Sequence, residues 1–181
     1  MKNLSEHIMD IAQNSIKAEA CNVVVEIKDV GDVLEIRIED DGCGMDKETV
    51  NRVTDPFYTT RTTRKVGLGI PFLKQHAEQA GGGVTISSDR GVGTVLTATF
   101  TTSNIDCPPV GDLHVTIALL ITGNPDVNFI FSYLKDGNRY KLSTNDIKEA
   151  VGDLDISMPK ITGFIKDMIK ENLLNIGVEL N

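Results

Sequence analysis

The sequence predicts an α+β protein in which a mixed β-sheet carries helices on one face, followed by a smaller α+β module. Three observations predict it: an amphipathic helical pattern opens the chain, alternating apolar runs come in pairs, and glycine-rich turns separate them. Residues 1–104 show the order helix, two strands, short helix, loop, helix, two strands, which is typical of a two-layer α/β sandwich. Residues 105–181 are expected to form the second module.

Residues 4–18 predict the first, amphipathic helix. An apolar stripe at helical spacing is expected to face the core: Leu4, Ile8, Ile11 and Ser15. A polar stripe lies on a neighbouring face: His7, Asp10, Asn14 and Lys17. Such a stripe is ordinarily a solvated surface, but the glycine loops downstream favour its placement at the edge of a pocket.

The next elements follow from alternation and from turn residues. Residues 23–30 and 33–40 alternate as two strands joined in a hairpin at Gly31-Asp32. A short helix is predicted over 45–53 and a longer one over 69–79, where Pro71 is acceptable in the first turn. The glycines at 81–83 end this helix, and two further strands are predicted over 84–88 and 94–100.

Cys107-Pro108-Pro109 marks the predicted boundary between the two parts. Two strands are predicted around Asp136-Gly137-Asn138, with Val127, Phe129, Phe131 and Tyr133 on one face. Helices are predicted over 112–121, 145–151 and 160–176, with a turn at 124–126. This part contains no recognisable chemical motif.

Composition excludes several classes of function. The net charge is −8, which argues against nucleic acid as the main partner, because counterion release needs clustered Lys and Arg. No apolar window of membrane-spanning length occurs, so no membrane partner is expected. The 3 cysteines are unpatterned and fit reduced thiols better than disulfides or a zinc site. We therefore expect a cytoplasmic protein.

Four short motifs follow the first helix in a fixed order. Asp40-Asp41-Gly42-Cys43-Gly44 ends a strand, and Asp55-Pro56-Phe57-Tyr58-Thr59-Thr60-Arg61, Gly67-Leu68-Gly69 and Gly91-Val92-Gly93-Thr94 come after it. A calcium loop at the first motif is excluded, because Asn51 stands where the twelfth-position acid is needed. The third motif is neither a Walker motif nor a Rossmann fingerprint.

This order of motifs resembles the GHKL ATPase superfamily, which groups gyrase, the ninety-kilodalton heat-shock chaperone, histidine kinases and the MutL ATPase. Residues 55–61 and the short path to Gly67 are most similar to histidine-kinase catalytic domains. The resemblance covers residues 1–104 and implies a Bergerat ATP-binding fold with ATP and Mg²⁺ as ligands. It does not extend to residues 105–181.

The resemblance implies a role for each matching residue at the base end of the nucleotide. Asp40 would accept the exocyclic N–H of adenine, directly or through water, and Thr94 would add a hydroxyl to the same network. Gly42 and Gly44 would let the backbone approach the purine face. Without the resemblance, Asp40 would be a turn-starting residue and the two glycines a plain turn.

At the phosphate end, Asn14 would bind Mg²⁺ through its amide oxygen and Lys17 would meet a phosphate. Asp10 stands where the ATP-hydrolysing branches carry a glutamate base. It is a shorter carboxylate, which could orient a water molecule or complete the metal shell.

The remaining implied contacts come from the loop and from the second helix. Gly67, Leu68 and Gly69 open that helix, whose free N–H groups can bind phosphate oxygens. From the loop, Arg61 would reach the terminal phosphate, with Arg64 or Lys65 as further candidates. Phe57 would pack beneath the loop, and Thr60 belongs to the same nucleotide-binding motif.

Three functions stay open at this point. The leading one is transfer of the γ-phosphate of ATP to a partner protein in bacterial signalling, as by histidine kinases or anti-sigma serine kinases. None of the three histidines lies in a dimerising helical hairpin: His7 is expected at the pocket edge, and His76 and His114 on helix surfaces. The phosphate acceptor is therefore expected on another chain. The alternatives are a slow ATPase that uses Asp10, and an ATP sensor without enzymatic activity.

Overall fold

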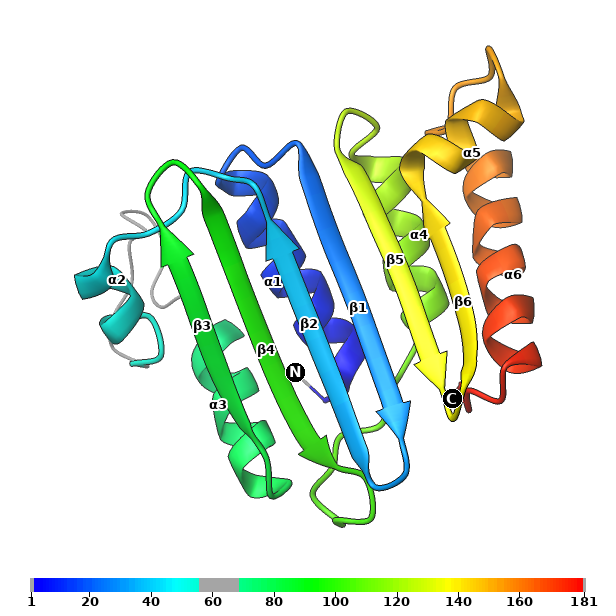
Figure 1. Ribbon diagram of the computed structural model, residues 1–181. Helices are drawn as coiled ribbons and strands as arrows, with labels where there is room; N and C mark the ends of the chain where they lie inside the picture. Colours follow the sequence, from blue (N-terminus) through cyan, green and yellow to red (C-terminus); the bar gives the residue numbers. More distant parts are fainter. Residues whose placement is uncertain (1, 56–68, 181) are drawn as a thin grey trace.

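The computed structural model describes residues 2–55 and 69–180. Its helices are α1 Leu4–Lys17, α2 Lys47–Arg52, α3 Gly69–Gln79, α4 Leu113–Gly123, α5 Thr144–Val151 and α6 Pro159–Asn175 (Figure 1). Its strands are β1 Asn22–Val30, β2 Val33–Asp40, β3 Gly83–Asp89, β4 Gly93–Thr101, β5 Asn128–Lys135 and β6 Asn138–Ser143. The predicted elements lie within one or two residues of these bounds, and α3 begins and ends where it was predicted.

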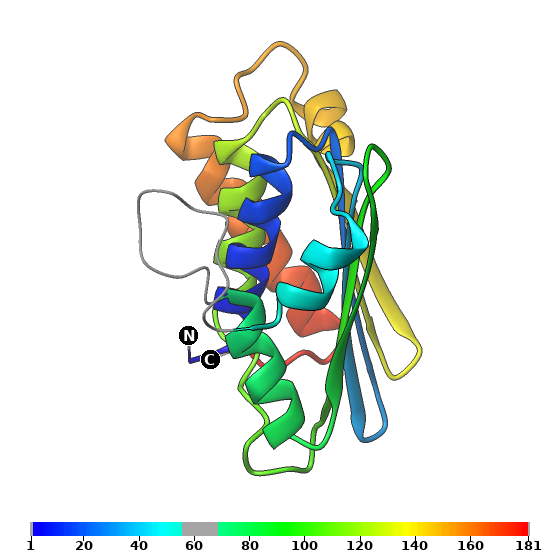
Figure 2. The same ribbon diagram turned by 90° about the vertical axis from the view of Figure 1, so that its left-hand side faces the viewer.

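The strands form one sheet of 6 strands in the order β3-β4-β2-β1-β5-β6. The pairing of β1 with β5 is parallel, and every other neighbouring pair is antiparallel. Figure 2 shows the helices of the described residues gathered on one face of this sheet. The predicted α+β sandwich with a mixed sheet and helices on one face is therefore confirmed.

Helix α1 is held at its start and along its apolar stripe. The side chain of Asn3 accepts a hydrogen bond from the Glu6 N–H at 2.9 Å, which caps the first turn. The predicted stripe is buried throughout, at exposed fractions of 1–5%: Leu4, Ile8, Ile11 and Ser15. Helix α1 packs between α3 and α4, so it contacts both parts of the chain.

The core lies between the helices and the inner face of the sheet. Alternate residues of each strand point into it, and the largest ones on β5 are Phe129, Phe131 and Tyr133, which are at most 2% exposed. Burying each such side chain stabilises the fold by roughly 1.5–3 kcal/mol. The predicted apolar face of this strand is confirmed.

The second part of the chain adds to the sheet of the first. β5 pairs with β1 from Asn22↔Asn128 to Asp29↔Lys135. Asp29 is 8% exposed and accepts hydrogen bonds from Tyr133 Oη at 3.2 Å and from Lys135 Nζ at 2.8 Å. The division into domains 1–104 and 105–181 stays a prediction, while the strands of both parts share one sheet.

Among the residues described, none of the helices has the length and apolar character that a membrane crossing requires.

Candidate nucleotide site

The candidate site begins with a row of polar side chains across three neighbouring strands. Asp40 ends β2 and pairs in register with Thr94 on β4, which pairs in turn with Ser88 on β3. Because side chains alternate along a strand, these three lie on the same face as the buried Ile38 and Leu96, toward the helices. The polar row therefore faces the helical layer at one end of the sheet.

The carboxylate of Asp40 is oriented by two donors. The Ser15 hydroxyl donates to Asp40 Oδ2 at 2.5 Å, and the Gly42 N–H donates to Oδ1 at 3.0 Å. Ser15 lies on α1 and is 3% exposed, so its hydroxyl is held in place by packing. This fixed, half-buried carboxylate can accept a further hydrogen bond from a ligand, as the adenine prediction requires.

The neighbouring Asp41 has a different, local role. Its carboxylate accepts hydrogen bonds at 2.8 Å from the N–H groups of Cys21 and Asn22 and from the Asn22 side chain. The bond from the Asn22 side chain is the main reason why the pKa of Asp41 lies below its ordinary value. Asp41 thus ties the loop to the start of β1, and Asp40 is the residue that remains directed toward the site.

The glycines of the loop pack against other backbone segments. A Cβ on Gly42 would lie 2.7 Å from the Ala18 carbonyl oxygen, and a Cβ on Gly44, whose φ is +63°, would lie 2.0 Å from that of Asp89. The Cys43 N–H donates to Ala18 O at 2.8 Å, and the Gly91 N–H donates to Cys43 O at 2.8 Å. The loop after β2, the end of α1 and the β3–β4 turn therefore form one contiguous unit. The purine contact of Gly42 and Gly44 stays a prediction.

The other end of the site is where α1 meets the start of α3. Asp10 is half-buried, and its carboxylate lies against Gly69, so that a Cβ on Gly69 would fall 1.6 Å from Asp10 Oδ2. Gly69 is the first residue of α3, and the helix dipole there favours a negative charge. The predicted metal-binding helix and the predicted phosphate-binding glycine are thus brought together.

The residues at this end fit a magnesium ion. Asp10 and Asn14 lie four residues apart on α1, so their carboxylate and amide oxygens share one face of the helix. Mg²⁺ prefers oxygen ligands and keeps part of its water shell. Among the residues described, no three or more His, Cys, Asp or Glu side chains cluster as a ready-made metal site. An ion here would therefore be held by one or two of these oxygens, by phosphates and by water.

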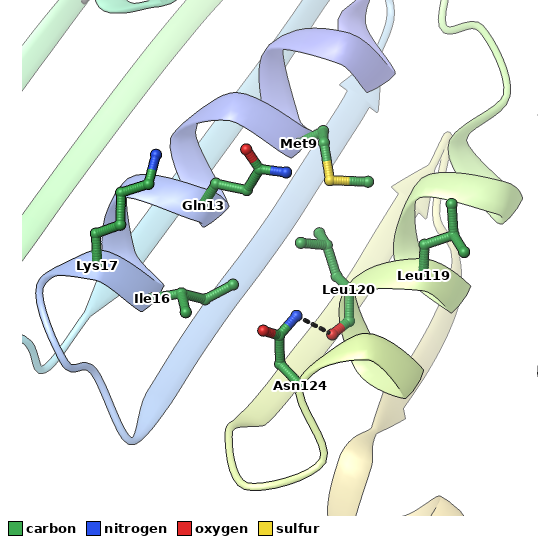
Figure 3. A pocket seen from close by; sticks show the side chains of 7 residues that line it. All are labelled: Met9, Gln13, Ile16, Lys17, Leu119, Leu120 and Asn124. Atoms are coloured by element: carbon green, nitrogen blue, oxygen red, sulfur yellow. Dashed lines mark hydrogen bonds between the residues drawn. The ribbon is translucent and has the colours of Figure 1, made fainter. Parts of the chain in front are cut away.

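Lys17 is exposed and lines a groove between α1 and α4 (Figure 3). The groove has a volume of about 380 Å³, and its walls are Met9, Gln13, Ile16, Leu119, Leu120 and Asn124. Asn124 donates to the Leu120 carbonyl oxygen at 2.9 Å and closes one end of it. The predicted contact of Lys17 with phosphate stays a prediction.

Several predicted site residues lie outside the described part of the chain: Phe57, Thr60, Arg61, Gly67 and Leu68, together with the further candidates Arg64 and Lys65.

Two of the three histidines, His7 and His114, are more deeply buried than the sequence predicted. His7 is 1% exposed rather than at a pocket edge, and its Nε2 lies 2.8 Å from Nδ1 of His76 on α3. His114 is 7% exposed rather than on the surface, because α4 is covered by α6. Burial, and then the proximity of His76, lower the pKa of His7 to about 4. The helical pattern could not reveal which faces of α1, α3 and α4 a later element covers.

Sequence reasoning missed two residues of the site. Ser15 was predicted only as part of the core-facing stripe, and Ser88 was not predicted to act at all. The alternation of β3 places Ser88 on the inner face, but its proximity to Thr94 depends on a strand register that the local sequence does not specify.

Proteins with similar sequences match about half of the chain. The chain is 29% identical over 86 residues to the "Probable C4-dicarboxylate sensor kinase" of Bacillus subtilis, and 32% identical over 96 residues to sporulation kinase E of the same organism. These matches cover 48% and 51% of this chain but only 16% and 13% of the two kinases. The chain thus spans a small part of the length of the relatives that it matches.

A likeness in fold extends further along the chain. The crystal structure of the N-terminal domain of a DNA repair protein aligns with 86% of this chain and 59% of its own, with a TM-score of 0.59 and 17% sequence identity. In addition, residues 2–104 match the family model described as histidine kinase-, DNA gyrase B-, and HSP90-like ATPase, which confirms the predicted superfamily. The chain belongs to the family of histidine kinase-, DNA gyrase B-, and HSP90-like ATPases.

Proposed function

We propose that this protein binds Mg-ATP and transfers its γ-phosphate to a partner protein in bacterial signalling. In this reaction the bond between the γ-phosphorus and the bridging oxygen breaks, ADP leaves, and the γ-phosphorus bonds to an acceptor atom of the partner. Phosphoryl transfer depends mainly on positioning and charge stabilisation, so the protein needs a site that holds both ends of the nucleotide. Mg²⁺, when bound, would neutralise charge on the phosphates.

The observation that carries the proposal is that a single helix links the two ends of the site. Ser15 of α1 donates to Asp40, which the proposal assigns to the base, and Asp10 of α1 touches Gly69, which it assigns to the phosphates. Ser15 lies five positions after Asp10, a separation of roughly 7.5 Å along the helix axis. One extended ligand can therefore be in contact with both ends, and Asn14 lies between them.

The relatives favour kinase chemistry, because the matches include a sensor kinase and a sporulation kinase. A slow ATPase is the second candidate, and it rests on the position of Asp10 beside the start of α3. A carboxylate there could orient a water molecule toward a terminal phosphate.

The test separates binding, hydrolysis and transfer. The purified protein is incubated with γ-labelled ATP and Mg²⁺, and bound nucleotide, free phosphate and protein-bound label are followed together. Asp40→Asn keeps the shape of the side chain but places a donor where an acceptor is needed, so ATP affinity should fall at least tenfold. Adding an extract of the source cells should then produce a labelled protein, and Asn14→Ala should abolish that labelling.

The other outcomes are equally decisive. Free phosphate that appears without extract and disappears with Asp10→Asn would replace the transfer reaction by the ATPase. Label on the isolated chain would place the acceptor within it. Equal ATP affinity of the parent and Asp40→Asn would overturn the adenine assignment.

A further inference from the structure

The hydroxyl of Ser88 makes three contacts, and together they fix where its proton points. It accepts the N–H of Met45 at 2.8 Å, donates to the carbonyl oxygen of Gly93 at 2.7 Å, and lies 2.9 Å from the hydroxyl of Thr94. A serine carries one hydroxyl proton, and a carbonyl oxygen can only accept. The Ser88 hydroxyl therefore donates its proton to the hydrogen bond with Gly93 O, because otherwise two acceptor oxygens would lie 2.7 Å apart.

The direction of the Thr94 hydroxyl follows from this assignment. With the Ser88 proton committed, the hydrogen bond between the two hydroxyls requires Thr94 to be the donor. Thr94 has no second proton to give. Toward a ligand it therefore presents lone pairs alone.

Asp40, the strand partner of Thr94, is restricted in the same way. Its two oxygens accept hydrogen bonds from the Ser15 hydroxyl and from the Gly42 N–H, and a carboxylate oxygen acts as an acceptor. The Asp40–Thr94 pair is thus a surface of acceptors. A water molecule that bridges the two side chains must donate a hydrogen bond to each of them. It can then only accept a hydrogen bond from a ligand. The requirement for a donor on the ligand holds with or without that water.

We propose that Ser88 is a specificity-determining positioning residue. It accepts the hydrogen bond of the Thr94 hydroxyl, so that Thr94 cannot donate to a ligand, and the site binds a purine edge with an amino group and rejects one with a carbonyl. The inference rests on the proposed nucleotide site. An amino group pairs with these half-buried acceptors, whereas a carbonyl oxygen in the same position faces them with a further acceptor, which penalises binding. Ser88 acts through Thr94, since its own hydrogen bonds go to Met45, Gly93 and Thr94.

The experiment compares the Kd values of ATP and inosine triphosphate, in which a carbonyl replaces the amino group of adenine. The parent should prefer ATP. In Ser88→Ala the Thr94 hydroxyl is free to rotate and donate, so the preference for ATP should fall about tenfold, equivalent to about 1.4 kcal/mol. A merely structural role of Ser88 would weaken both ligands equally and leave their ratio unchanged. Ser87→Ala is the matched control, because Ser87 is exposed on the opposite face of the same strand.

Variants of Thr94 keep the test decisive if Ser88→Ala does not fold. Thr94→Ser retains the hydroxyl and its bond to Ser88, and should keep the preference for ATP. Thr94→Val removes this acceptor while Asp40 remains, so it should lower the preference for ATP. Adding Ser88→Ala to Thr94→Val should then change the preference no further. A selective parent whose preference survives both Ser88→Ala and Thr94→Val would overturn the inference but leave the proposed function intact. A parent that does not bind ATP would overturn the proposed function itself.

Discussion

The carboxylate of Asp10 occupies the space in which a side chain at Gly69 would begin. An added Cβ would lie 1.6 Å from Asp10 Oδ2 and 2.7 Å from Asp10 Cγ. Asp10 belongs to α1 and Gly69 begins α3, so this contact sets how closely the predicted metal-binding and phosphate-binding ends of the site approach each other.

Gly69→Ala should therefore force α1 and α3 apart. Overpacking of this kind typically costs about 1–3 kcal/mol, and the same displacement should weaken ATP binding. Chemical denaturation and ATP titration measure the two effects. Asp10→Ala in the same chain removes the clash, so the double variant should regain most of the lost stability.

The control for this variant is Gly163→Ala in α6. An added Cβ there meets nothing within 4 Å, so the substitution should stabilise the helix by up to about 1 kcal/mol. Equal stabilities of Gly69→Ala and Gly163→Ala would contradict the close approach of Asp10.

Ser15→Ala should weaken ATP binding while the fold persists. The variant removes the donor to Asp40 Oδ2, and a hydrogen bond to a charged group is worth about 1.5–3 kcal/mol. The Kd for ATP should accordingly rise about tenfold or more. Ser5→Ala is the matched control, because Ser5 is an equally buried serine of α1 that donates to Asn3 instead. A Kd that rises equally in both variants would show that the effect comes from the helix rather than from Asp40.

Stability should fall as the pH is lowered from 7.5 to 5, with His7 as a main cause. The pKa of His7 is about 4 in the folded protein, against an ordinary value of 6.5. Below pH 6.5 the unfolded chain therefore binds a proton that the folded protein does not, and folding becomes less favourable. The loss should reach roughly 2 kcal/mol at pH 5.

His7→Gln should flatten this dependence in urea denaturation at a series of pH values. Burial also lowers the pKa of His114, which adds to the loss of stability at low pH. The variant His114→Gln should therefore retain the share of the pH dependence that is due to His7. A slope that is identical in the parent and in His7→Gln would show that His7 titrates normally in the folded state.

Asp29→Ala should destabilise the junction between β1 and β5. The substitution leaves the Tyr133 hydroxyl buried without its acceptor and removes the ion pair with Lys135. An unsatisfied buried hydroxyl costs about 1–3 kcal/mol. Tyr133→Phe removes the hydroxyl itself, so no buried donor is left without an acceptor, and this variant should lose less stability. Urea denaturation should therefore find the parent most stable, Tyr133→Phe less stable and Asp29→Ala least stable.

Local patterns were sufficient to predict the elements. They also supplied the candidate site residues, whose roles stay predictions. Alternation predicted β1 and β2, and helical spacing predicted the buried stripe of α1, because each signal lies within one element. Asp40 was predicted from its place at the end of a strand before two glycines. The structure added Ser15, which lies 25 positions away from Asp40 and could not be connected to it by spacing alone.

The features that could not be predicted depend on contacts between residues far apart in the sequence. The pattern of β5 predicted a strand but not its partner, because an apolar face fits either a separate module or the edge of an existing sheet. His7 and His76 are 69 positions apart, and their contact depends on how α3 packs against α1. Both cases require knowledge of which faces meet, and that is decided by packing over the whole chain.

The parallel pairing of β1 with β5 joins two strands that are synthesised at different times. Asn22 and Asn128 are partners in the sheet but 106 positions apart, so a growing chain completes β1 long before β5 leaves the ribosome. During that interval a strand from the middle of the finished sheet has an open edge, which can pair with other nascent chains. Glu26 and Lys28, on the outer face of β1, place opposite charges along this temporary edge and would make such pairing less favourable.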